Sequence, residues 1–81
     1  MACRVQISSE FRLPSIVRRK LRERLEHICA ILDALDRAFL VSLAQSSLAV
    51  DIEAWRFRYE YELASNRLVV TEAMPAWRRK G

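Results

Sequence analysis

The chain has 81 residues, of which 52% are hydrophobic and 30% are charged, and its formal net charge is +4. This composition excludes a disordered chain, and the length predicts a single domain with a thin hydrophobic core. Because no run approaches the ~20 apolar residues that span a bilayer, and the N-terminus has no apolar signal segment, we expect a cytoplasmic protein without a membrane anchor.

The first elements are a short strand and a long helix. Residues 4–8 alternate between apolar and polar side chains, which is typical of a strand. Pro14 and Ser15 then favour the start of a helix, because proline is tolerated in the first helical turn. The apolar residues that follow are spaced by four and three, which places them on one helical stripe. They are Leu21, Leu25, Ile28, Leu32, Leu35 and Phe39.

The end of this helix has two interpretations. If the helix continued past Ala38, Leu40 and Val41 would lie on its polar side. If residues 39–44 instead formed a strand, their side chains would divide between its two faces. We predict a helix over about 15–37 and then a strand to about 44, and the alternative is one helix running to Gln45.

The C-terminal half predicts two further strands. Aromatic residues alternate with charged residues over 55–62, and a bulge or break near Glu53-Ala54 explains the opposite parity of the residues before it. A turn over 64–67 predicts a hairpin in which Leu63 faces Leu68, and Pro75 ends the sheet.

These elements predict an α+β fold with the two-layer order β-α-β-β-β, in which one long amphipathic helix packs on a small antiparallel sheet. The aromatic row is expected to form the core face beneath the helix. Residues 1–75 form the domain, and residues 76–81 form a basic C-terminal tail.

The two cysteines, Cys3 and Cys29, indicate neither a metal site nor a disulfide framework. A structural zinc site normally needs four ligands, and His27 is the only histidine. We therefore expect a reducing compartment, with Cys29 as a small buried apolar residue. By elimination, a second chain is the expected additional stabiliser of this thin core.

Basic side chains crowd the start of the predicted helix, where positive charge opposes the helix dipole. Three interpretations stay open: a solvated helix face, a dock for an acidic protein, and contacts to a nucleic-acid backbone. The acidic middle of the chain, with a net charge of −4 over residues 25–63, argues against non-specific DNA binding. The candidate partner-binding residues are Arg18, Arg19, Arg22, Trp77, Arg78 and Arg79.

A run of alanines spaced by four offers a flat second face on the helix. Ala30, Ala34 and Ala38 are the candidate dimer face, and we expect a homodimer or a tightly bound protein partner.

Catalytic and cofactor motifs are not recognisable. Phosphate-binding loops need glycines for close backbone approach, and the single glycine is Gly81. We expect no catalytic residues, no metal and no cofactor. The leading hypothesis is a small non-enzymatic protein-binding module, a format common among regulators and inhibitors encoded by mobile elements.

Three segments resemble the RelE/ParE superfamily of ribonuclease and gyrase toxins. They are residues 17–25, residues 55–61 and residues 66–70, and with the order of strand, basic helix and antiparallel strands the resemblance covers about half the chain through amphipathic patterns. The resemblance implies a nucleic-acid-directed toxin, and it would place phosphate contacts or acid–base work on Arg56, Arg58, Tyr59 and Arg67. This toxin-like ribonuclease is the alternative hypothesis.

Overall fold

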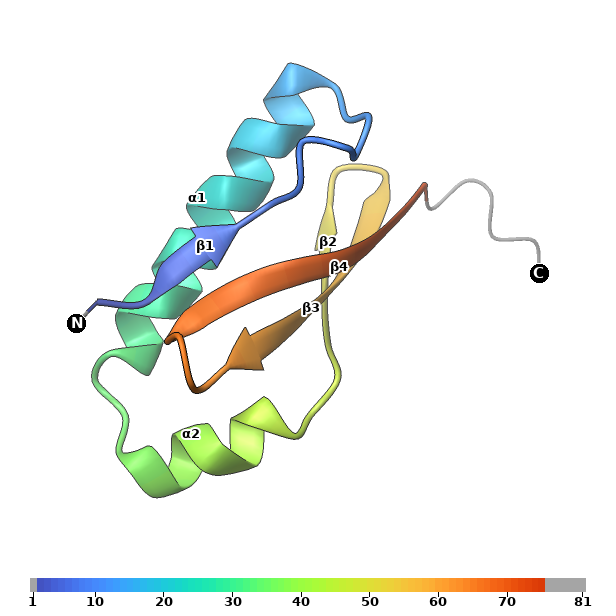
Figure 1. Cartoon of the computed structure of the whole chain (residues 1–81). Helices are drawn as coiled ribbons and strands as arrows, with labels where there is room; N and C mark the ends of the chain where they lie inside the picture. Colours follow the sequence, from blue (N-terminus) through green and yellow to red (C-terminus); the bar gives the residue numbers. More distant parts are fainter. Residues whose placement is uncertain (1, 76–81) are drawn as a thin grey trace.

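The computed structural model describes residues 2–75 of the chain. Their four strands form one sheet in the order β1-β4-β3-β2, in which β1 runs parallel to β4 and the other neighbours are antiparallel. Helix α1 lies along one face of this sheet, and α2 crosses its end (Figure 1). The elements are β1 (Arg4–Gln6), α1 (Ser15–Leu32), α2 (Arg37–Ala44), β2 (Leu48–Ile52), β3 (Trp55–Glu62) and β4 (Arg67–Pro75).

The predicted α+β class is confirmed, and its core lies between α1 and the sheet. The helix buries Val17, Leu21, Leu25, Cys29 and Leu32. The facing sheet residues include Phe57, Tyr59 and Tyr61 from the aromatic row, which therefore forms the core face as predicted. Two elements differ from the prediction: the sheet is mixed because β1 is parallel, and a second helix replaces a predicted strand.

The first helix ends earlier than predicted, at Leu32 rather than near Arg37. The N–H groups of Ala34 and Leu35 bond to the carbonyls three residues before them, at 3.0 and 3.1 Å, which tightens the chain into a turn. Asp36 is then extended, and its carboxylate accepts a 3.0 Å hydrogen bond from the N–H of Phe39. Asp36 is therefore the N-cap of a new helix.

The strand predicted over 39–44 is wrong, because Arg37–Ala44 forms helix α2. Six of its eight residues are apolar, so the segment is apolar on nearly every side and shows neither the period of a strand nor that of a helix. The N-cap at Asp36 is the local signal that decides between the two, and the periodicity argument did not use it.

The apolar residues before Trp55 alternate with the opposite parity from those after it because a two-residue hairpin turn separates two strands. Ile52 pairs with Trp55, so Glu53 and Ala54 form the turn, with Glu53 in the left-handed region at φ 55°. The next hairpin differs from its predicted register by two residues, since Leu68 faces Tyr61 and not Leu63. A shift of two residues keeps side chains on their predicted faces as far as Tyr59, where a register irregularity between Arg58 and Tyr59 shifts the pairing by one further residue.

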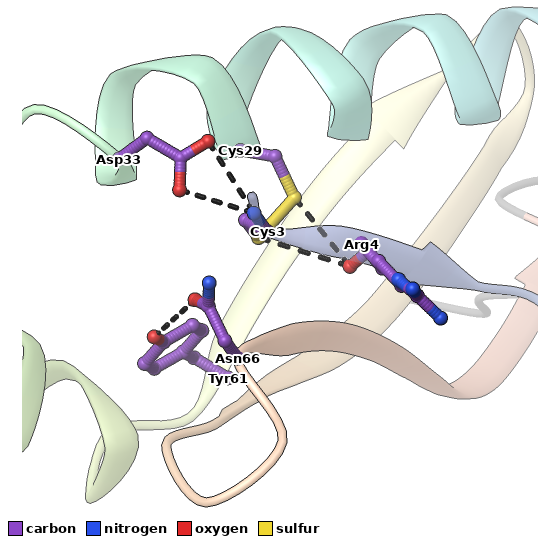
Figure 2. Close-up of a disulfide and its surroundings, with 6 residues drawn as sticks. All are labelled: Cys3, Arg4, Cys29, Asp33, Tyr61 and Asn66. Carbon is purple, nitrogen blue, oxygen red and sulfur yellow. Dashed lines mark hydrogen bonds between the residues drawn. A yellow bond between two sulfur atoms is a disulfide. The ribbon is translucent and has the colours of Figure 1, made fainter. Parts of the chain in front are cut away.

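A disulfide joins Cys3 to Cys29, with 5.2 Å between the two Cα atoms. Cys29 is buried as predicted, but its pairing with Cys3 differs from the expectation that the two cysteines form no disulfide. The fold places the start of β1 beside the last turns of α1, which the sequence spacing could not show (Figure 2). A cross-link between residues 26 apart stabilises a domain by about 3.5 kcal/mol in the loop-closure estimate. A second chain was expected only because no disulfide or metal was expected to stabilise the core. The disulfide removes that reason.

Candidate functional site

Helix α2 exposes an apolar surface. No residue of this helix is buried, and the side chains of Phe39 and Val41 are 52% and 39% exposed. Ala38 is also exposed and lies between these two around the helix. We call Ala38, Phe39 and Val41 the α2 surface. Exposed aromatic and branched apolar side chains on one short helix are typical of an interaction site.

A groove of about 300 Å³ lies beside the α2 surface. Its walls come from the end of α1, from α2 and from the turn between β3 and β4. Polar atoms contribute more of its accessible surface than apolar atoms, and its lining mixes apolar and polar residues: Leu32, Asp33, Leu35, Arg37, Leu40, Tyr61, Leu63 and Asn66.

Two of these polar groups are held in place by hydrogen bonds. The Tyr61 hydroxyl donates to Asn66 Oδ1 at 2.6 Å, and Asp33 Oδ1 accepts from the N–H of Cys3 at 3.0 Å. Asn66 itself occupies the left-handed region at φ 53°, which asparagine tolerates better than most residues. The groove wall is therefore set by specific contacts between three elements (Figure 2).

The three helical arginines predicted to bind a partner have different surroundings. Arg18 is half-buried, and its guanidinium donates to the carbonyls of Ser8 and Phe11 at 3.2 and 2.6 Å. It ties the loop after β1 to the helix. Arg19 and Arg22 are exposed on α1. The other three candidates, Trp77, Arg78 and Arg79, lie outside the described residues.

The predicted alanine face is not one helical stripe. Ala30 belongs to α1, Ala34 to the turn that follows, and Ala38 to α2, because α1 ends at Leu32. All three side chains are exposed. Their spacing of four residues therefore does not align them, and a dimer through this face loses its geometric premise.

The outer face of the sheet carries arginines paired with carboxylates. Arg56 Nε lies 2.8 Å from Asp51, Arg67 Nε 2.7 Å from Glu62, and Arg58 Nε 3.7 Å from Glu72. The hydrogen bond from Arg67, assisted by one from Ser65, lowers the pKa of Glu62. In the same way, the hydrogen bond and charge of Asp51 raise the pKa of Arg56.

The residues that the toxin resemblance would use are thus divided between two faces. The three paired arginines lie on the outer face, whereas Tyr59 is buried in the core, where burial raises its pKa against a smaller opposing effect of Arg24. Tyr59 therefore does not share a surface with these arginines.

A second depression, of about 490 Å³, lies between α1 and the β2–β3 hairpin. Charges of both signs line it, and Lys20 forms an ion pair with Glu53 across it. The lining residues are Lys20, Glu23, Arg24, Asp51, Ile52 and Glu53. Because the acidic and basic groups nearly balance, this depression has no clear preference for a ligand of either charge.

Comparisons with protein-family models, with curated proteins and with solved structures find no match. The residues of this chain therefore carry the functional argument. Over residues 2–75, no three His, Cys, Asp or Glu side chains gather to hold a metal ion, and no helix of that range is long and apolar enough to cross a membrane.

Sequence reasoning missed the α2 surface and its groove. The signal was present in the N-cap residue Asp36 followed by an apolar run, since a short capped helix that is apolar on every side cannot bury all of itself against one small sheet. The groove had no sequence signal, because its walls come from residues up to 34 positions apart in the chain.

Proposed function

We propose that this protein is a small non-enzymatic binding module, a regulator or inhibitor that acts through a protein–protein interface centred on the α2 surface. The observation that carries the proposal is the exposure of Phe39 and Val41 on a helix with no buried residue. Interface hot spots are commonly aromatic side chains that enter a pocket of the partner, surrounded by less critical contacts. Phe39 supplies such an anchor.

The groove beside α2 gives this surface a complementary feature. Its leucines can contact one apolar side chain of a partner, while polar groups, among them Arg37 and Asp33, form the larger part of the lining. We therefore propose a protein partner that presents an apolar side chain flanked by polar ones. The expected cytoplasmic location stays part of this proposal.

The α2 surface by itself is too small for a stable interface, whether the partner is a different protein or a second copy of this chain. A stable interface buries roughly 800 Å² on each partner. That is about a seventh of the 5668 Å² accessible surface of the described chain, far more than one eight-residue helix offers. Either kind of partner therefore requires contacts beyond α2.

Substitution of Phe39 tests the proposal. The variant F39D is compared with I16D, because Ile16 is a similarly exposed apolar residue, at 43%, near the start of α1 and far from α2. We expect tagged wild-type protein and I16D to retain the same protein partner from native cells. F39D is expected to lose it, and its affinity for the purified partner should fall at least about tenfold in calorimetry.

A further variant separates the other hypotheses. If R19E/R22E abolishes the interaction while F39D leaves it intact, the α2 proposal is wrong and the arginines of α1 form the interface. Recovery of RNA or DNA in place of a protein, with an affinity that falls steeply with salt, would favour the nucleic-acid alternative. That alternative has weaker support, since the outer-face arginines already contact carboxylates.

A further inference from the structure

The N-terminal strand is held by one covalent bond and few other contacts. Strand β1 has three residues, which pair in parallel with Arg67, Leu68 and Val69 of β4. Such a short pairing is weak by itself. The N–H of Arg4 adds a 3.1 Å bond to the carbonyl of Asn66, and the N–H of Cys3 bonds to Asp33.

The N–H groups of Cys3 and Arg4, at the start of β1, bond to two residues that line the groove, whereas Gln6 at the end of β1 accepts a side-chain hydrogen bond from Arg67. Asp33 stands at the end of α1, and Asn66 stands before β4, on different walls. The disulfide lies between them, bonding the start of β1 to α1 (Figure 2). With the disulfide closed, β1 therefore bridges two walls of the groove.

The segment after β1 is fixed independently. Ile7 is buried in the core, and the Arg18 guanidinium donates to the carbonyls of Ser8 and Phe11. These contacts do not involve either cysteine. A release of β1 would consequently stop at Ile7 and leave the rest of the domain in place.

We infer that Cys3 and Cys29 form a redox latch, in which the disulfide docks β1 against α1 and the groove walls and its reduction frees residues 3–6. The inference goes beyond the proposed function and does not depend on any partner. In a reducing compartment the dithiol form would predominate, so the inference then describes a protein in which residues 3–6 are mostly released.

The reductant is a dithiol, and the reaction is thiol–disulfide exchange. Its thiolate attacks Cys3 Sγ, because Cys3 is half-buried whereas Cys29 is buried. A bond forms between the reductant and Cys3, and Cys29 leaves as a thiolate and takes a proton. The second reductant thiol then displaces Cys3 as a thiolate, which is also protonated, and the reductant becomes a disulfide. Two electrons and two protons pass to the protein.

The surroundings accommodate the reduced pair as well. The carbonyl oxygen of Arg4 lies 3.5 Å from Cys29 Sγ and 3.7 Å from Cys3 Sγ. A disulfide sulfur has no proton to donate, but each thiol has one, so this carbonyl can accept a weak hydrogen bond from the reduced form. Such a bond is far weaker than the covalent tie that it replaces.

Hydrogen exchange of the wild-type protein tests the latch. Amide exchange is measured by NMR in oxidised glutathione and then in dithiothreitol, with thiol titration to confirm each state. Reduction lowers overall stability and so speeds exchange at Leu21 and Phe57 in the core, but we expect exchange at Arg4, Val5 and Gln6 to rise at least about tenfold more than exchange at these two core residues. The signals of Asp33 and Asn66 should shift at the same time.

The variant C3S/C29A is the matched control, and its exchange should match reduced wild type and not respond to dithiothreitol. If this variant does not fold, the comparison of oxidised with reduced wild-type protein still tests the latch. Thiols that stay free in oxidised glutathione overturn the latch, as does equal β1 exchange in both states. A rise at Leu21 and Phe57 as large as the rise at β1 also overturns it, since the bond then stabilises only the fold as a whole.

Discussion

The two helices of this domain are both rich in apolar residues, yet they differ in what they bury. Helix α1 buries five residues in the core, whereas α2 buries none and only packs the half-buried Leu40, Leu43 and Ala44 against it. A four-stranded sheet is roughly 15 Å across and a helix with its side chains is about 10 Å wide, so one helix covers most of one face. The comparison teaches that the area offered by the sheet, and not hydrophobicity alone, decides which helix buries its apolar face and which helix keeps apolar side chains exposed.

Truncation of a core residue of α1 has the largest expected effect. Leu25 is completely buried, and L25A removes its contacts and leaves a cavity, so the free energy of unfolding should fall by about 2–5 kcal/mol. The control is L40A on α2, where the leucine is only half-buried and the loss should be clearly smaller. Urea denaturation followed by circular dichroism measures both, and equal losses would contradict the distinction between the helices.

Removal of the disulfide comes next. The variant C3S/C29A should lose about 3.5 kcal/mol, because its unfolded chain regains the conformational freedom that the cross-link removes. Denaturation of the wild-type protein with and without dithiothreitol measures the same difference without a substitution. If reduction leaves the denaturation midpoint unchanged, the junction between α1 and β1 contributes nothing to stability.

Substitution of Asn66 tests how much one wall of the groove contributes to stability. The variant N66A places alanine at a positive φ and removes the acceptor of the Tyr61 hydroxyl, so we expect a loss of about 2 kcal/mol. Glycine accepts that φ at no steric cost, so N66G should lose only about half as much. Thermal unfolding compares the two variants. Identical losses would show that the backbone conformation contributes little.

The core face of the sheet should respond to alkaline pH through Tyr59. Burial raises the pKa of this phenol above its unfolded value of 10.0, so the unfolded chain ionises first. Its contribution is therefore fully present below about pH 10 and is lost as pH rises through the folded-state pKa. Relative to wild type, Y59F should flatten the fall in unfolding free energy above pH 10, as measured by urea denaturation. A curve parallel to that of the wild type would contradict this role.

The smallest expected effect on stability belongs to the α2 surface. Phe39 is half exposed, so F39A should change the free energy of unfolding by no more than about 0.5 kcal/mol. The same urea denaturation assay measures the change in unfolding free energy for F39A and for L25A. A loss approaching that of L25A would mean that Phe39 supports the fold, and its value as an interaction anchor would then need a different argument.

Sequence patterns predicted the elements that have one strong periodicity. The alternation over 55–62 gave both the strand and its buried face, and the spacing of Leu21, Leu25 and Leu32 gave the inner stripe of α1. Over 37–44 the pattern was ambiguous, and the helix cap at Asp36 was the deciding feature. Of the candidate site, the sequence analysis named Ala38 as part of a dimer face, but it did not identify the exposure of Phe39 and Val41 or the groove.

The sequence by itself determined the α+β class, the aromatic core face and the helix that covers it, because each depends on periodicity within one segment. Tertiary structure alone decided three further features: the parallel pairing of β1, the meeting of Cys3 with Cys29, and the exposure of α2. Each depends on which distant segments become neighbours and on how much sheet surface is left to cover. A local pattern holds no information about either.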